Sequence, residues 1–192
     1  MSFAALLLLI RTLGLTLPLW LVAGWSAAEA AIFFLVADIP ISWIAVRRGT
    51  RAGILAAVVA ALASLVGGLA MWVWAGHDAS GATNAMAALP GIDQALIAEA
   101  ADRYRHGPLA ILAGSFSGIP FKLFALEAGQ RQDLLIILLA PLLRLPRFAA
   151  VALLTGSLSR SLSRWLVERQ RLVLLGLIWI IFYACYFAVM PR

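Results

Sequence analysis

Six charged residues lie inside or beside long apolar runs, and these side chains are the best placed to do chemistry: Glu29, Asp38, Lys122, Arg147, Arg160 and Arg164. A charged side chain at the centre of a membrane helix costs about 2.5–3.5 kcal/mol or more, so chains that keep one use it for pairing or for function. Cations suit an anionic group such as a phosphate, and carboxylates can accept protons. We therefore expect a site that handles a charged group within an apolar protein.

Arg160 is the strongest single candidate. It lies 14 residues into a helix that is predicted to begin at Pro146. Polar residues at helical spacing surround it and predict one polar stripe facing the bundle interior or water: Ser157, Arg160, Ser161, Arg164 and Glu168. The alternative is an arginine that extends to the membrane surface or pairs with Glu29 or Asp38. Arg164 is one turn nearer the helix end, which favours the surface alternative there.

Lys122 and Arg147 each follow a proline. Lys122 comes two residues after Pro120 in a broken apolar segment, where its amine could meet a phosphate beside free backbone amides. Its alternative role is an interfacial lysine with an apolar stem in lipid. Arg147 comes directly after Pro146 at a predicted helix entrance, where an interfacial anchor is the alternative.

Glu29 and Asp38 are candidate proton acceptors, because burial favours the protonated form of a carboxyl group while a nearby arginine favours the charged form. The alternative is that both carboxylates are counter-charges for arginines.

Other reactive chemistry is not expected. His77 and His106 lie at the two ends of a polar stretch, and Cys185 is the single cysteine, so the pattern indicates no metal site. The sequence GSFSG has Phe116 at the position where a nucleophile elbow needs serine. We therefore expect no catalytic residue, no cofactor and no enzyme activity.

Composition predicts an all-α integral membrane protein. Of the 192 residues, 64% are hydrophobic and 12% are charged, whereas soluble domains have about 25% charged residues. The net charge of +6 comes almost entirely from arginine, and no basic, wettable surface suitable for nucleic acid is visible. Positively charged loops on the cytoplasmic side explain the charge.

The chain reads as one polytopic membrane domain, 1–192. Apolar periodicity predicts membrane helices at 3–24, 52–75, 146–168 and 172–190, with a separate short helix at 132–143 that ends near Pro141. Small residues recur every four positions in the second of these spans, which predicts close helix contact: Ala56, Ala60, Ser64 and Gly68. The arginine-rich sequence RRGTRAG, 47–53, is expected in the cytoplasm.

Two apolar runs are interrupted by proline and predict re-entrant hairpins. The first, 29–46, contains Asp38 and Pro40, and the second, 109–129, contains Gly118 and Pro120. Such breaks are tolerated only where protein or a water-filled cavity covers the backbone, and paired broken segments are typical of transporter sites. Between them, 76–107 is predicted as an external loop followed by a surface helix, 91–105.

The sequence GSFSGIPFKLFALEAG, 114–129, resembles the second re-entrant motif of the DedA (VTT, SNARE-associated) superfamily, and is closest to its small YqaA-like branch. Arg147, Gly156 and Arg160 resemble the arginine-bearing helix of that branch, and the segment from Glu29 to Pro40 resembles its first hairpin. The likeness covers about 25–170. Gly118 occupies the place of the first proline in the family's Pro-x-Pro pattern.

The resemblance implies two re-entrant hairpins that meet head to head in a helical bundle of a bacterial inner or plasma membrane. It implies site roles for Glu29, Asp38, Lys122, Arg147 and Arg160. The positions expected to set the loop geometry are Pro40, Gly118, Pro120, Gly129 and Gly156.

The implied function is movement of lipids between leaflets, with phospholipid or polyprenyl phosphate as substrate and protons as a possible coupling ion. The expected partners are therefore lipids with phosphate headgroups, and a homo-oligomer is possible. Two alternatives remain open. One is a structural or regulatory membrane subunit whose arginines pair with a partner's acidic groups. The less favoured one is an enzyme acting on a lipid phosphate, for which the chain lacks a convincing histidine or carboxylate cluster.

Overall fold

The computed structural model describes residues 16–189, and within them every regular element is helical. In chain order the helices are α2 (Thr16–Ala31), α3 (Asp38–Arg48), α4 (Thr50–His77), α5 (Ala79–Ala87), α6 (Gln94–Arg105), α7 (Pro108–Phe116), α8 (Phe121–Gln130), α9 (Leu134–Leu162) and α10 (Glu168–Val189). The predicted all-α class is confirmed.

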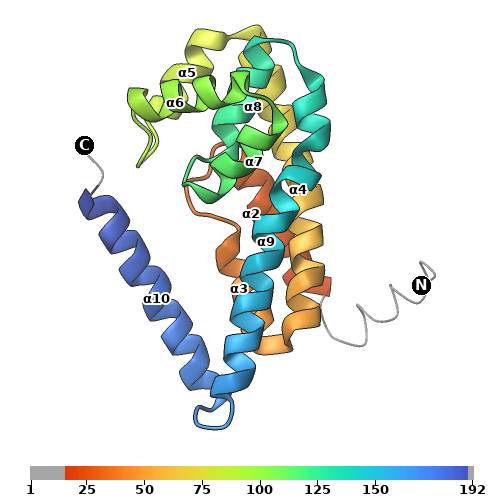
Figure 1. Cartoon of the computed structure of the whole chain (residues 1–192), viewed down its shortest axis with the longest axis vertical. Helices are drawn as coiled ribbons and strands as arrows, with labels where there is room; N and C mark the ends of the chain where they lie inside the picture. The colour runs from red at the N-terminus through yellow and green to blue at the C-terminus, as the bar shows by residue number, and fades with distance from the viewer. Residues whose placement is uncertain (1–15, 190–192) are drawn as a thin grey trace, which may run out of the picture.

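The helices form an elongated bundle (Figure 1). The long helices α4 and α9 run side by side, α2 and α3 pack against them, and the short helices α5 to α8 gather at one end. Helix α10 starts at the opposite end, beside the end of α9, and leans away from the bundle (Figure 1).

Small residues on α4 let its neighbours approach closely. Ala56, Ala60, Ser64 and Gly68 are all buried, so the predicted contact stripe is confirmed. The Ser26 hydroxyl of α2 donates a hydrogen bond of 2.7 Å to the Ala60 carbonyl. Between helices surrounded by lipid the hydrophobic effect contributes little, and close packing at small residues provides the attraction instead.

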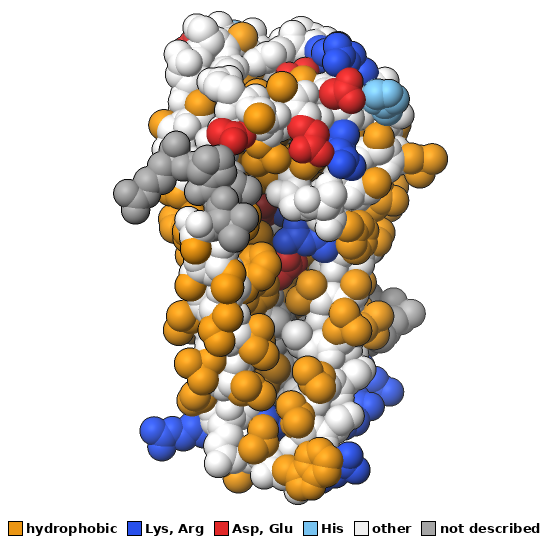
Figure 2. Space-filling model, turned by 60° about the vertical axis from the view of Figure 1, so that its left-hand side comes forward, with side chains coloured by type: hydrophobic (Ala, Val, Ile, Leu, Met, Phe, Trp, Pro, Cys, Tyr) orange, Lys and Arg blue, Asp and Glu red, His pale blue; other side chains and the backbone are white. Residues whose placement is uncertain are grey.

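Three helices in the described part of the chain are long and apolar enough to cross a membrane: Thr50–His77, Leu134–Leu162 and Glu168–Ala188. Side chains of many apolar residues on these helices are exposed, while charged side chains gather mainly at the two ends of the molecule (Figure 2). This distribution suits a protein whose middle is surrounded by hydrocarbon.

The prediction of a helix that ends near Pro141, followed by another that begins at Pro146, is wrong. Both prolines lie inside one continuous helix, α9. Each proline removes one backbone donor, which an apolar helix tolerates when the packed neighbours hold it straight. As a result, Arg147 lies in the middle of a long helix and Arg160 lies near its end.

Other boundaries also differ. Helix α2 continues to Ala31, through Glu29, so the predicted first hairpin begins inside a helix, and the start of the predicted helix 3–24 lies outside the described residues. Part of the predicted loop 76–84 forms α5 instead, because the Asp78 carboxylate caps it by accepting from the Gly81 N–H.

The surface helix at 91–105 is confirmed as α6, with bounds three residues later at its start. Ala100 and Tyr104 of its apolar stripe are buried. The Tyr104 hydroxyl donates a 2.7 Å hydrogen bond to Asp133, at the start of α9. Burial and this carboxylate raise the pKa of Tyr104, so the bond persists at neutral pH.

The predicted loop-geometry residues have distinct roles. Pro40 lies in the first turn of α3 and Pro120 directly precedes α8, where a missing N–H removes no helical bond. Gly118 has φ of +94°, a conformation that favours glycine. Gly129 and Gly156 lie in helices, against the backbones of Trp72 and Thr50 respectively.

We expect Gly129→Ala to lower thermal stability. A Cβ at Gly129 would lie 2.5 Å from the Trp72 carbonyl oxygen and 3.0 Å from the Trp72 Cα, so backbone would have to move. Such overpacking costs about 1–3 kcal/mol. The matched control is Gly24→Ala, where nothing lies within 4 Å. Melting curves in detergent should show a lower midpoint for Gly129→Ala alone; equal midpoints would contradict the packing.

Candidate functional site

The loop between α2 and α3 and the loop between α7 and α8 meet at one cavity of about 680 Å³. The loop between α2 and α3 contributes Phe34 and Val36, and the loop between α7 and α8 contributes Ser117, Gly118 and Pro120. Charged side chains at the cavity are Glu29, Asp38, Lys122 and Arg147. Two segments about 80 residues apart in the chain therefore build one polar centre.

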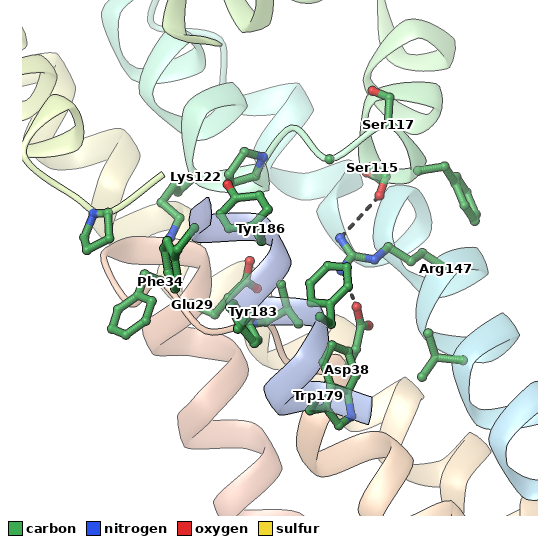
Figure 3. Close-up of a pocket in the computed structure, with 18 of the residues that line it drawn as sticks. Glu29, Phe34, Asp38, Ser115, Ser117, Lys122, Arg147, Trp179, Tyr183 and Tyr186 are labelled. Carbon is green, nitrogen blue, oxygen red and sulfur yellow. Dashed lines mark hydrogen bonds and ion pairs between the residues drawn. The ribbon is translucent and has the colours of Figure 1, made fainter. Parts of the chain in front are cut away.

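Helix α10 forms the other side of the cavity with an aromatic wall, defined as Trp179, Phe182, Tyr183, Tyr186 and Phe187. Residues of α9, among them Val151 and Leu154, add apolar surface. Figure 3 shows Tyr183 and Tyr186 of α10 between Lys122 and Arg147 in this view, with Asp38 beside Arg147. The cavity is thus polar at the hairpin loops and apolar along the two helices.

Three hydrogen bonds attach the aromatic wall to the bundle. The Tyr183 hydroxyl accepts from the Val36 N–H at 2.9 Å. Trp179 Nε1 donates to the Ser42 hydroxyl at 3.1 Å, and the Tyr186 hydroxyl donates to the Gly91 carbonyl at 3.1 Å. These bonds hold α10, whose other side chains are mostly apolar, beside the polar loops.

Two ion pairs cross the site. Arg147 Nη2 donates to Asp38 Oδ2, and Arg147 Nη1 donates to the Ser115 carbonyl at 3.3 Å, as Figure 3 shows. Arg144 Nη2 donates to Glu29 Oε2. Asp38 Oδ1 is buried without a hydrogen-bond partner in the described part of the chain. The carboxylate therefore keeps one acceptor oxygen free.

Arg144 is the best-enclosed arginine of the site. Only 4% of its surface is exposed, and its guanidinium lies over the rings of Phe148 at 4.7 Å and Phe121 at 5.2 Å. Aromatic faces stabilise a desolvated cation through their quadrupoles. With Glu29, which is 3% exposed, Arg144 forms a structural ion pair behind the cavity.

Lys122 is the cation that no carboxylate neutralises. It is 2% exposed, and Nζ donates a 2.6 Å hydrogen bond to the Phe33 carbonyl, just beyond the end of α2. The negative end of a helix dipole favours a cation there. Among the described residues, no carboxylate oxygen lies within 4.0 Å of its amine. Glu29 and Asp38 pair with the two arginines, so Lys122 is the one cation of the site without an ion pair at contact distance in the described part of the chain.

Four of the six predicted site residues come together at the cavity: Glu29, Asp38, Lys122 and Arg147. Arg160 and Arg164 do not join them. Both are exposed, Arg160 near the end of α9 and Arg164 in the turn before α10. The predicted polar stripe around Arg160 therefore does not enter the bundle. Glu29 and Asp38 pair with Arg144 and Arg147, as the counter-charge alternative predicts, although not with Arg160.

Sequence reasoning missed Arg144 as a buried partner and missed the aromatic wall. The wall had a readable signal, because its five residues recur at three- and four-residue spacing within WIIFYACYF, 179–187. The pairing of Glu29 with Arg144 had none, because the two residues are 115 positions apart.

No protein-family model, no curated protein and no solved structure matches this chain. Function is therefore argued from the cavity itself.

We expect Glu29 and Arg144 to be energetically coupled. Removing one partner of a buried pair leaves an uncompensated charge and costs about 3–5 kcal/mol, whereas replacing both by apolar residues can be nearly neutral. Glu29→Met and Arg144→Met should each lower the melting temperature strongly, and the double variant should recover most of the loss.

The exposed pair of Glu99 and Arg103 is the matched control for this cycle, because such pairs contribute about 1 kcal/mol or less. Additive effects of Glu29→Met and Arg144→Met in chemical denaturation would contradict the pairing.

Proposed function

We propose that this protein moves lipids with phosphate headgroups from one leaflet of a membrane to the other. The observation that carries the proposal is Lys122, a cation without an ion pair, buried at the polar end of a cavity whose walls along α9 and α10 are apolar and aromatic. A lipid has the same two parts, an anionic head and an apolar tail.

The phosphate would bind at Lys122. A charge-assisted hydrogen bond from the amine to a phosphate oxygen is stronger than the present bond to a neutral carbonyl. Arg147 could turn one N–H to the same phosphate, since it lies on the cavity and its side chain is 24% exposed. Pro120 and Lys122 also bring the start of α8 to the cavity, and helix N-termini favour anions.

The tail would remain among apolar side chains. Between α10 and α9 the cavity is lined by residues such as Leu154, Ile178 and Phe182. Figure 2 shows charged side chains midway along the molecule, within a furrow flanked by hydrophobic columns. A headgroup could therefore enter from the side while its tail stays in hydrocarbon.

Protons could be coupled to this movement through Asp38. When Arg147 contacts a phosphate, Asp38 loses part of its counter-charge, and a buried carboxylate without a counter-charge favours protonation. Glu29 stays paired with Arg144 and is a weaker candidate. This exchange would link binding of an anion to uptake of a proton.

The likeness of the chain to the DedA superfamily supports the same assignment, as does a pair of helix–loop–helix units with their loops at one cavity. The re-entrant placement of these units in a bilayer and a bacterial inner membrane location are parts of the proposal. The competing assignment is a regulatory subunit that moves no lipid by itself.

Lys122→Met should abolish lipid movement without unfolding the protein. Methionine fills a similar volume, and losing a charge-assisted bond of about 1.5–3 kcal/mol should slow transport by more than about tenfold. The measurement is transfer of labelled phospholipid or polyprenyl phosphate in proteoliposomes of purified protein, with melting curves to verify folding.

Arg160→Met is the matched control, because Arg160 lies outside the cavity, and its transport should remain near wild type. Full transport by Lys122→Met would overturn the site. A folded wild type that moves no lipid would favour the regulatory-subunit assignment.

A topology measurement tests the membrane placement. The end of the molecule with Arg47, Arg48 and Arg51 should face the cytoplasm. In a Cys185→Ser background, Arg51→Cys should react with an impermeant thiol reagent only from the cytoplasmic side, and Ser80→Cys only from the other. Labelling of both from one side would contradict a spanning α4.

A further inference from the structure

The end of the molecule where α3 meets α4 and α9 meets α10 is strongly basic, and it is called the basic end here. It contains seven arginines and a single carboxylate, Glu168: Arg47, Arg48, Arg51, Arg160, Arg164, Arg169 and Arg171. Six of these arginines are exposed, and Arg171 is partly buried. Figure 2 shows basic side chains projecting at this end.

Direct contacts show that α3, α9 and α10 lie together at this end. Arg47 Nε of α3 is 3.3 Å from Glu168 Oε1 of α10. Arg171 Nη1 donates to the Ser159 hydroxyl of α9 at 2.7 Å, and that hydroxyl donates to the Val46 carbonyl of α3 at 3.4 Å. The arginines therefore form one surface, of which Glu168 neutralises a single charge.

The opposite end of the described structure has the reverse balance. Six carboxylates are found there with three arginines: Asp78, Asp93, Glu99, Asp102, Glu127 and Asp133, against Arg103, Arg105 and Arg131. Arginine is therefore not in excess over the whole surface of the described structure. The excess of arginine is confined to the basic end. Its like charges repel one another, and a negatively charged partner would relieve that repulsion.

Two exposed tryptophans identify that partner as lipid. Trp165 is 69% exposed and lies 3.9 Å below the Arg164 guanidinium, and Trp43 lies 5.1 Å below that of Arg47. Tryptophan concentrates at the level of lipid headgroups. Each arginine held over such a ring would therefore be at the depth of the phosphates. The apolar helices α4, α9 and α10 continue from this end, so the surface would lie at the headgroup level of a bilayer. A lipid is better placed there than a soluble polyanion.

We propose that the basic end is a binding surface for anionic lipid headgroups of the facing leaflet, separate from the cavity at Lys122. The inference uses only the membrane placement from the proposed function and requires no lipid movement. Arg160 and Arg164, which do not reach the cavity, are thereby assigned to this surface with Arg169.

The test is lipid competition on the purified full chain in detergent. Equal amounts of phosphatidylglycerol and phosphatidylcholine are added, and retained lipids are counted by native mass spectrometry. Both lipids contain a phosphodiester, but only the first has a net negative charge. We expect the anionic lipid to be preferred by about tenfold or more, since each basic residue near such a surface contributes about fivefold.

Arg160→Gln/Arg164→Gln should reduce this preference by up to about 25-fold, at about fivefold for each arginine removed, while the matched pair Arg103→Gln/Arg105→Gln at the opposite end should leave it unchanged. Raising the salt concentration should weaken it. Equal retention of the two lipids by wild type would overturn the proposal.

Lys122→Met separates this surface from the cavity. The preference should persist in that variant even if lipid movement is lost. A preference that disappears in Lys122→Met and survives in Arg160→Gln/Arg164→Gln would place the anionic lipid in the cavity and overturn the proposal. Inorganic phosphate at the concentration of the lipids should not compete, and competition would show recognition of a free anion instead.

Discussion

The structure depends on enclosing charged side chains in an apolar bundle. Glu29, Asp38, Lys122 and Arg144 are buried and Arg147 is partly buried where the α2–α3 and α7–α8 loops approach α9, and desolvating even one charge is costly unless a partner is present. Two ion pairs, two aromatic rings and two backbone carbonyls provide those partners. Since each pair joins an early segment to α9, the same contacts that neutralise the charges also fix the relative positions of distant helices.

The division of labour among these charges follows from their surroundings. Arg144 and Glu29 are both nearly fully buried, and their ion pair joins α9 to α2. Arg147 and Asp38 are paired but remain on the cavity, so they can exchange partners. Lys122 holds a neutral acceptor that an anion would outcompete. The stability of the bundle and the proposed function would thus depend on neighbouring side chains of similar type.

Local chemistry in the sequence was sufficient for much of the fold. The small-residue stripe of α4 and the surface helix α6 are read from spacing, because each depends on residues within a few turns. The helix boundaries predicted at Pro141 and Pro146 are wrong, because packing maintains the helix although each proline removes one backbone hydrogen bond.

The same error explains the misplaced emphasis on Arg160. Counting from Pro146 put it deep in a helix, whereas α9 starts at Leu134 and ends at Leu162. Lys122, Glu29, Asp38 and Arg147 could be selected as charges in apolar surroundings. Their pairings could not, because contacts between positions about 110 apart leave no periodic trace in a single sequence.

Lys122 is the chain's single lysine, and its amine is enclosed at the cavity. Apart from the terminal α-amino group, every primary amine of the protein is therefore this one. Amine-directed reagents, isotopic labels or fluorescent tags would report on a single location without any engineered substitution. Their rate of reaction would report how accessible the Lys122 amine is in the native protein.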